Sequence, residues 1–282
     1  MPTILFCGIA NLLDNMLLIY TANQSPFPPE TREVQLDEKW SFVYKKQKNC
    51  AANSEKRNGD NWDYVAYDPE HKLVLEVIPG KRTAANTDKI IAGMKKRTGG
   101  KQLALISSDE YKPYTKAILK YYGDVVQPER KGKVGRLPKP IMVAPKGLNY
   151  VVVHKTRKDG KVIKIEPKII FGEEEDIYES LSNSNVSRSI NTSFIERYNG
   201  TDRHQNARKA RCTYEFSKKW ECHNWSTFFV SYVYNFCWPV RTLRRKDEEG
   251  KYIKVTPAMA AKLTDHVWSL EEWLSMPAVQ SS

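Results

Sequence analysis

Three carboxylates that stand far apart in the sequence are the candidates for chemistry. Asp37 follows the apolar start of a strand-like segment, Asp109 follows a short apolar strand, and Glu196 lies in a strongly basic stretch, residues 191–211. Two-metal phosphoryl chemistry requires clustered carboxylates on rigid elements, because the two ions lie only about 3.5–4 Å apart. Mg²⁺ prefers oxygen ligands and keeps part of its water, so two or three acids suffice. The three residues are candidate metal ligands, provided that the fold brings them together.

Each of these acids also has an ordinary structural interpretation. Asp37 fits an outward position on an edge strand. Asp109 fits the first turn of a helix, where acids are favoured, and residues 107–110 have the Ser-x-x-Glu spacing of a capping box. Residues 193–196 have the same spacing. Because carboxylates are common at strand and helix ends, spacing alone leaves both interpretations open.

The elements that must position these acids begin with three strands. Val34–Val43, Trp62–Tyr67 and Leu73–Ile78 have strand composition, with a polar loop after the first of them. Their short connections predict an antiparallel meander.

A change of period follows the meander. Asn86 or Thr87 can cap a helix that ends at Gly99-Gly100, and its apolar residues recur every three to four positions. A short strand, Leu103–Ile106, follows and should run parallel to the first strand. A second helix should then reach about Tyr122. This order predicts a mixed α/β fold of the ribonuclease H-like type, with antiparallel strands first, then parallel strands, and flanking helices.

The middle of the chain is basic. Gln127–Pro145 is rich in Gly, Pro and cations and predicts a loop, either lying along phosphates or simply solvated. Residues 150–171 predict a basic inserted hairpin around Asp159-Gly160, a pair suited to a type I′ turn. Glu173–Ser180 predicts a short acidic helix.

The last third begins with an aromatic segment, Trp220–Leu243. Stacking on bases is one use of such residues, but aromatic residues at helical spacing more often form core. The segment is too polar and too short to span a membrane. Thr256–Leu274 predicts a final amphipathic helix that starts with Pro257.

The overall charge favours a polyanionic partner. The 282 residues include 45 Lys+Arg and 33 Asp+Glu, which gives a formal net charge of +12 and a pI near 9.3. Nucleic acid is the first expectation because binding releases its counterions, and an anionic membrane surface is the second.

The cysteines and the N-terminus indicate the compartment. Five scattered cysteines without a Cys-x-x-Cys pair predict neither a disulfide framework nor a zinc site. Thr3–Tyr20 is apolar but lacks a basic start and carries Asn and Asp, so it favours a leader helix over a signal peptide. We therefore expect a cytoplasmic, nucleoid-associated protein without a membrane segment.

Four segments carry a resemblance to a known family: LDEKWSFV, WDYVAYD, ISSDEYKPY and SFIERYNGTDRHQNARKARCTYEFSKKW. They resemble the catalytic half of transposases of the insertion-sequence-one (IS-one) family. The resemblance covers roughly Thr31–Leu243, and the tail TPAMAAKLTDHVWSLEEWL extends it. The match around Glu196 is the most specific. The resemblance implies a DDE enzyme with a ribonuclease H-like core.

The same resemblance assigns roles. It implies that Asp37, Asp109 and Glu196 are the catalytic residues and hold two Mg²⁺ ions, or Mn²⁺ in their place. The implied reaction is phosphodiester hydrolysis at the transposon ends, after which the freed 3′-hydroxyl attacks target DNA. Arg203 follows Glu196 by two helical turns on one face and suits a phosphate contact. Asn199-Gly200 between them is a turn signal and predicts a kinked helix.

The implied partners are DNA and further copies of the chain. The residues expected to bind the DNA are basic side chains of residues 191–211, of the hairpin and of the loop after Asp109: Arg203, Arg197, Arg208, Lys209, Arg211, Lys155, Arg157, Lys158 and Lys112. Transposases of this kind usually act as multimers on paired ends, so a homo-oligomer is expected.

The N-terminus departs from the family. Full-length relatives carry a zinc-binding and helix-turn-helix region there, whereas nothing in residues 1–30 looks like a recognition helix. The expected organisation is a leader over 1–30, the catalytic domain over 31–245, and a charged linker with the C-terminal helix over 246–282. The departure keeps two alternatives open: a truncated, non-catalytic remnant that binds DNA or a partner transposase, and a general ribonuclease H-like nuclease.

Overall fold

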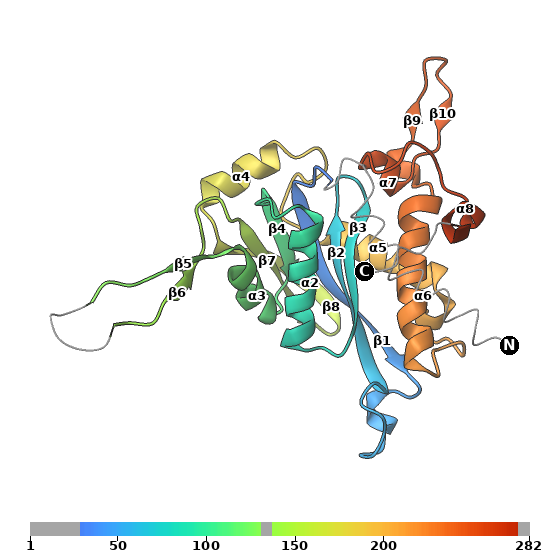
Figure 1. Ribbon diagram of the computed structural model, residues 1–282, viewed down its shortest axis with the longest axis horizontal. Helices are drawn as coiled ribbons and strands as arrows, with labels where there is room; N and C mark the ends of the chain where they lie inside the picture. The colour runs from blue at the N-terminus through green and yellow to red at the C-terminus, as the bar shows by residue number, and fades with distance from the viewer. Residues whose placement is uncertain (1–28, 131–136, 276–282) are drawn as a thin grey trace.

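A computed structural model describes residues 29–130 and 137–275, so the predicted leader lies almost wholly outside the described residues (Figure 1). The centre of the fold is a six-stranded sheet with the order β3-β2-β1-β4-β7-β8. Its strands are β1 (Glu33–Val43), β2 (Gly59–Asp68), β3 (Leu73–Gly80), β4 (Leu105–Asp109), β7 (Tyr150–Lys158) and β8 (Lys161–Phe171).

The strand directions confirm the predicted fold class. The pairs β1–β2 and β2–β3 are antiparallel, β1–β4 and β4–β7 are parallel, and β7–β8 is antiparallel. A helix crosses over before each of the two parallel strands, as the sequence order required. The chain therefore has a mixed α/β, ribonuclease H-like fold with an added basic hairpin strand at one edge.

Helices cover both faces of the sheet. The first face packs against α2 (Ala84–Arg97) and α3 (Pro113–Tyr122), which lie in front of it in Figure 1. The second face packs against α4 (Glu174–Ser182), α5 (Ser193–Gln205) and α6 (Trp220–Tyr232). The acids of interest belong to this second face.

The alternation of β1 explains why a polar surface is buried there. Side chains of a strand point alternately to opposite faces. Val34 and Leu36 enter the core beneath α2 and α3. Gln35, Asp37 and Lys39 point to the other face, where each contacts α5 or the residues just before it. The strand is thus buried on both sides, apolar on one and polar on the other.

Several helix and strand boundaries differ from the sequence prediction. Helix α2 is capped by Thr83, whose hydroxyl accepts a hydrogen bond from the Asn86 N–H, and not by Asn86 or Thr87. Strand β4 begins two residues later than predicted and reaches Asp109. The Asp159-Gly160 turn is confirmed, with φ of 50° and 75°, because a type I′ turn needs two positive φ angles.

The prediction of a loop over residues 127–145 was wrong in part. Its end forms β6 (Ile141–Val143), which pairs with β5 (Asp124–Val126) in a two-stranded ribbon that projects from the body (Figure 1). The pattern was hard to predict because each strand has only three residues and mostly exposed side chains.

The aromatic segment is mostly core, as expected. After α6 the chain forms a five-residue π-helical turn, Val233–Cys237, in which Tyr234 and Phe236 are buried. Trp238, which follows this turn, is 49% exposed. Short 3-10 turns occur elsewhere, at Gln47–Asn49, Ala207–Lys209 and Arg241–Leu243.

The predicted final helix, Thr256–Leu274, was wrong. The chain instead forms two short helices, α7 (Pro257–Ala260) and α8 (Leu270–Ser275). Lys262 adopts a positive φ of 59°, which ends the first helix, and the Ser269 hydroxyl caps the second through the Glu272 N–H. A hairpin of β9 (Arg245–Lys246) and β10 (Tyr252–Ile253) precedes α7.

Candidate functional site

Asp37 and Asp109 lie side by side because their strands are parallel neighbours. The β1–β4 register pairs Gln35 with Ser107 and Leu36 with Ser108. One step further along both strands come the two aspartates. Asp109 is near enough to raise the pKa of Asp37 by its negative charge. The sequence prediction that these two acids meet agrees with the strand register.

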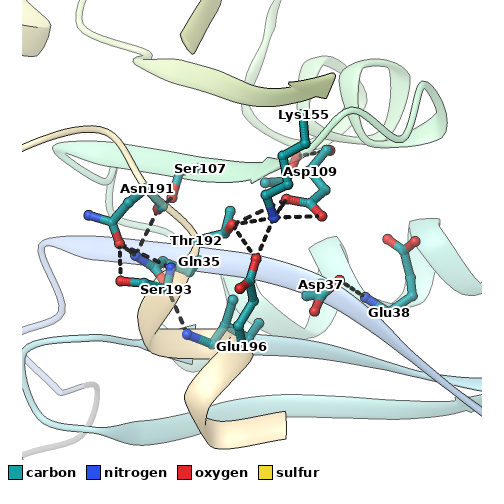
Figure 2. A network of polar contacts seen from close by, with 12 residues as sticks. Gln35, Asp37, Glu38, Ser107, Asp109, Lys155, Asn191, Thr192, Ser193 and Glu196 are labelled. Atoms are coloured by element: carbon teal, nitrogen blue, oxygen red, sulfur yellow. Dashed lines mark hydrogen bonds and ion pairs between the residues drawn. The ribbon is translucent and has the colours of Figure 1, made fainter. Parts of the chain in front are cut away.

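Glu196 comes to the same place from α5, and Lys155 joins it to Asp109. The Lys155 ammonium donates to Asp109 Oδ1 at 2.9 Å and also to Glu196 Oε1 (Figure 2). The Thr192 hydroxyl lies between the two acids, 3.2 Å from Asp109 Oδ1 and 3.1 Å from Glu196 Oε1. Burial lowers the pKa of Lys155, but its bonds to Glu196 and Asp109 raise it overall, so the side chain is positively charged.

The start of α5 is fixed to the sheet by Gln35. Its amide nitrogen donates to the Asn191 carbonyl at 2.9 Å, and its amide oxygen accepts from the Ile195 N–H at 3.0 Å (Figure 2). Ser107 Oγ also donates to the Asn191 carbonyl, at 3.3 Å. These bonds tie α5 to β1 and β4, the strands that carry the aspartates. No local sequence pattern indicates this contact, because its partners are 156 residues apart.

Asn199 is a second residue that the sequence analysis did not assign to the site. Its amide donates to Asp37 Oδ2 at 2.7 Å, while Asp37 Oδ1 accepts from the Glu38 N–H at 2.8 Å. The i,i+3 spacing from Glu196 places Asn199 on the same helix face and was a usable signal. The turn signal Asn199-Gly200 predicts a kink, and α5 runs through both residues as a helix.

The surroundings of Asp37 disfavour its charged form. Burial raises the pKa of Asp37 to about 6, and the negative charge of Asp109 adds to this effect. Glu196 contributes in the same direction. A carboxylate that is buried beside other carboxylates is a typical site for a cation, because a positive charge relieves the repulsion.

Neither predicted capping box forms. The Ser193 hydroxyl donates to Asn191 Oδ1, and Glu196 turns outward to Thr192 and Lys155. Helix α3 begins only at Pro113, four residues after Asp109. The ordinary interpretations of Asp109 and Glu196 as helix caps therefore do not describe this structure.

A hollow of about 620 Å³ lies beside the acids. Its lining includes the acids Asp37, Glu38 and Glu196 and the basic residues Arg203, His204 and Arg211. Arg203 shares this hollow with Glu196, in line with the two-turn spacing between them. The hollow therefore offers both carboxylates for cations and guanidinium groups for phosphate.

The remaining predicted cations are dispersed. Arg208 and Arg211 are exposed beside a neighbouring hollow, and Arg197 points to the opposite side of α5. Lys112 and Lys158 are exposed, and the side chain of Arg157 lies outside the described part of the chain. Lys209 does not join this surface, because its ammonium is buried against Asp63 and Thr227.

Lys209 belongs to a buried ionic cluster that lies next to the acids and shares strand β1 and helix α5 with them. Lys39 pairs with Asp63 and Asp202, and Lys209 pairs with Asp63, all with side chains at most 1% exposed. Burial raises the pKa of Asp63, but Lys209 and Lys39 hold it well below its usual range. The imidazole of His223 lies 3.8 Å from Asp63. Burial and the positive charge of Lys209 lower the pKa of His223 to about 3, so its imidazole is neutral.

The three carboxylates are the kind of ligand that a divalent cation prefers, but their side chains are not close enough together in this structure to hold one. Asp37, Asp109 and Glu196 supply the carboxylate oxygens that Mg²⁺ and Mn²⁺ prefer. Within residues 29–130 and 137–275, no three Asp, Glu, His or Cys side chains are close enough together to hold a metal ion. The Lys155 ammonium lies between two of the acids, where it acts as the positive charge.

Comparisons with known proteins add little. No protein-family model matches the chain, and no curated protein matches it. Solved structures do match, among them the Mos1 transposase paired-end complex with the left transposon end, at 15% identity and a TM-score of 0.22 over 40% of this chain and 39% of that one. The Mos1 strand transfer complex (16%, TM-score 0.23) and the Mos1 mariner paired-end complex with Mn (18%, TM-score 0.23) each match over 38% of their own length and about 40% of this chain. These alignments assign no family, and the fold stands on the chain's own strand order.

Among the residues that the structure describes, no helix is both long and apolar enough to cross a bilayer. The same part of the chain contains four cysteines, Cys50, Cys212, Cys222 and Cys237, and all four are free thiols.

Proposed function

We propose that this chain is the catalytic part of a DDE transposase of the IS-one type. Its reaction is metal-dependent phosphodiester hydrolysis at transposon ends, followed by strand transfer into target DNA. The observation that carries the proposal is that Asp37 and Asp109 lie side by side on neighbouring parallel strands of a ribonuclease H-like sheet, while Lys155 joins Asp109 to Glu196. The family resemblance of the segments around these residues supports the same reaction.

The charge distribution supports DNA as the substrate. The hollow beside the acids carries Arg203 and Arg211, and Arg208 lies in the adjoining hollow. A guanidinium group can bind a phosphate through two parallel hydrogen bonds. The acids would therefore receive the scissile phosphodiester while these arginines hold the neighbouring phosphates.

Each residue of the site has a distinct task. Asp37, Asp109 and Glu196 would hold Mg²⁺ or Mn²⁺, and the bound ion would supply activation of the attacking water and stabilisation of the leaving oxygen. Asn199 orients Asp37 by donating to Oδ2. Gln35 fixes the start of α5 and so sets the distance between Glu196 and the strands. Lys155 neutralises Asp109 and Glu196 when no metal is bound.

Cleavage of DNA tests this proposal. Purified protein is incubated with supercoiled plasmid, either alone or together with a duplex bearing a free 3′-hydroxyl, in Mg²⁺, Mn²⁺ or EDTA. We expect nicking of the plasmid and joining of the duplex to it in either metal and neither product in EDTA. Asp109→Asn should lower both rates at least about 100-fold, because each bound metal ion lowers the activation free energy by several kcal/mol.

The control removes the same charge elsewhere. Glu175 is exposed on α4, so Glu175→Gln keeps the fold and changes the net charge by the same amount. It should cleave like the unaltered protein. Equal activity of Asp109→Asn and Glu175→Gln would overturn the assignment of the site.

One observation favours a second function. The Lys155 ammonium already satisfies Asp109 and Glu196, as in a structural ion pair. In that case the chain would be a non-catalytic transposase remnant that binds DNA or pairs with a complete transposase. DNA binding without metal-dependent cleavage under the conditions above would favour this function.

A further inference from the structure

A second hollow lies on the other side of α5 from the acids. Glu196, Asn199 and Arg203 face the acidic hollow, whereas Phe194, Arg197 and other residues of α5 line the second one. Its opposite wall is formed by Trp238–Leu243, the segment that follows the π-helical turn. This hollow measures about 640 Å³, a size that accommodates one small-molecule-sized group such as an unstacked nucleotide.

The second hollow continues into a third. Trp238, Pro239, Val240 and Arg241 line both, and the third hollow reaches Tyr252 on the β9–β10 hairpin. The Val240 N–H donates to the Val255 carbonyl at 3.0 Å, which ties the Trp238–Arg241 segment to the chain after the hairpin. These two adjoining hollows are together called the Trp238 groove here, and their lining extends from α5 to the hairpin.

The charges of the Trp238 groove are almost all positive. Five cations line it: Lys72, Arg197, Arg241, Arg244 and Lys254. None of the five forms an ion pair with a carboxylate of the described residues. Among the described residues that line the groove, Glu70 alone is acidic, and it accepts a hydrogen bond from the Asn185 amide. A groove with this excess of cations attracts a polyanion.

Aromatic rings alternate with these cations. The Lys72 ammonium lies 4.0 Å from the Phe194 ring centroid, and the Arg244 guanidinium lies 4.1 Å from that of Tyr252. These rings hold their cations in place. The indole of Trp238, half exposed between them, has no ring or cation partner among the described residues. A half-exposed indole in a basic groove is a platform on which a base can stack.

We propose that the Trp238 groove binds single-stranded DNA, with one base stacked on Trp238 and the flanking phosphates held by Arg197 and Arg241. A duplex offers no free base face to the indole, because its bases are stacked on one another. An acidic protein segment would use the cations but not the indole. The combination therefore favours an unpaired strand over both.

The position of the groove connects it to the acids. Only the width of α5, about 10 Å, separates the two hollows. A strand held at the acids must pass around this helix, a path of roughly 16 Å or half its circumference, which about five nucleotides span at about 3.4 Å each. The groove would thus hold the single strand that extends from the cleaved position. This placement rests on the proposed function, but the binding itself does not.

Binding in EDTA tests the proposal independently of cleavage. A fluorescent oligo(dT) 12-mer and a duplex of the same length are titrated with protein, and fluorescence anisotropy gives both Kd values. Trp238→Ala should weaken oligo(dT) binding about 5- to 100-fold, the range for loss of one base stack. Duplex binding should stay unchanged. Trp238→Phe keeps an aromatic ring and should recover part of the loss.

A charge variant adds a second measurement. Arg241→Gln should lower the salt slope of oligo(dT) binding by about 0.7, the value for one lost phosphate contact. The matched control is Lys89→Gln, which removes an exposed cation from α2 on the other face of the sheet. Tyr178→Ala, on α4, is the control for loss of an exposed ring. Both controls should bind like the unaltered protein.

The outcomes separate the two proposals. Unchanged oligo(dT) binding by Trp238→Ala overturns the groove, whatever the cleavage assay shows. Displacement of oligo(dT) by polyglutamate with the same dependence on Trp238 also overturns it, in favour of an acidic protein partner. Asp109→Asn should retain oligo(dT) binding, so a failure of the catalytic proposal leaves the groove intact.

Discussion

Two charge clusters share β1 and α5 and differ in their balance. In the buried cluster, Lys39 and Lys209 neutralise Asp63 and Asp202, and every side chain is at most 1% exposed. In the acid cluster, Lys155 pairs with Asp109 and Glu196, and these two acids are 45% and 50% exposed. Asp37 and Lys39 are two residues apart on one face of one strand. Two adjacent positions of the same elements thus carry opposite kinds of chemistry.

The difference teaches which charges stabilise the fold and which are available for function. A closed, neutral cluster keeps its members fixed and offers no site to a ligand. An open cluster with excess negative charge is held at some electrostatic cost and can be relieved by a cation. The buried cluster fixes α5 through Lys39 and Asp202, and α5 in turn presents Glu196 and Asn199 to Asp37.

Breaking the buried cluster should give the largest effect. Asp63→Asn leaves the buried Lys209 without a carboxylate partner and Lys39 with Asp202 alone, so it should lower the free energy of unfolding by about 3–5 kcal/mol. Asp109→Asn, in the half-exposed acid cluster, should change it by at most about 1 kcal/mol. Urea denaturation measures both. Similar values for the two variants would contradict the contrast between the clusters.

Acid should weaken the buried cluster next. His223 is neutral in the fold with a pKa near 3, whereas in the unfolded chain it takes up a proton near its ordinary pKa of about 6.5. Unfolding therefore binds a proton, and stability falls as the pH drops below about 6.5, by up to about 1.4 kcal/mol per pH unit.

The variant His223→Asn isolates this contribution. Denaturation of both proteins between pH 7.5 and 4.5 should give a steeper loss for the unaltered protein, with the difference growing below pH 6.5. If the two curves stay parallel, His223 is not held neutral by the cluster.

Removal of Lys155 should sharpen the description of the acid cluster. Lys155→Gln leaves Asp109 and Glu196 without their ammonium partner, so in EDTA it should lower the free energy of unfolding by about 1 kcal/mol, as for a partly exposed pair. Mg²⁺ or Mn²⁺ should restore it and should raise the melting temperature more in this variant than in the unaltered protein. Thermal melts with and without metal measure this. An equal metal effect in both proteins would show that Lys155 and the cation do not occupy the same place.

Gly200 offers the smallest test, on the helix that both clusters share. An added Cβ there meets no atom within 4 Å. Gly200→Ala should therefore stabilise α5 by about 0.5–1 kcal/mol, because alanine favours the helix. Chemical denaturation should show a higher midpoint with an unchanged slope. A destabilised variant would mean that α5 is strained at this position, as the turn signal had suggested.

The sequence could predict what depends on local pattern. The meander, the crossover helices and the turn at Asp159-Gly160 follow from periodicity and turn chemistry, and they place Asp37 beside Asp109. It could not predict partners that are far apart in the chain, such as Gln35 with Asn191 or Lys39 with Asp202. A buried Lys209 looks like any other cation in a basic run, because burial is decided by the sheet beneath it.

The prediction for the end of the chain was wrong for a different reason. Thr256–Leu274 has helical spacing, but the positive φ at Lys262 and the cap at Ser269 divide it into two short helices. Trp238 shows the converse. It belongs to an aromatic run that is mostly core, and the π-helical turn before it leaves its indole at the surface.

Binding of Mn²⁺ is the most direct test of the central claim, that Asp37, Asp109 and Glu196 form a site for divalent cations. Isothermal titration of Mn²⁺ into the unaltered protein should show saturable binding. Asp37→Asn, Asp109→Asn and Glu196→Gln should each weaken it at least about tenfold, because each removes a charged oxygen ligand, while Glu175→Gln should not. Equal Mn²⁺ binding by the unaltered protein and a variant lacking all three carboxylates would contradict the account.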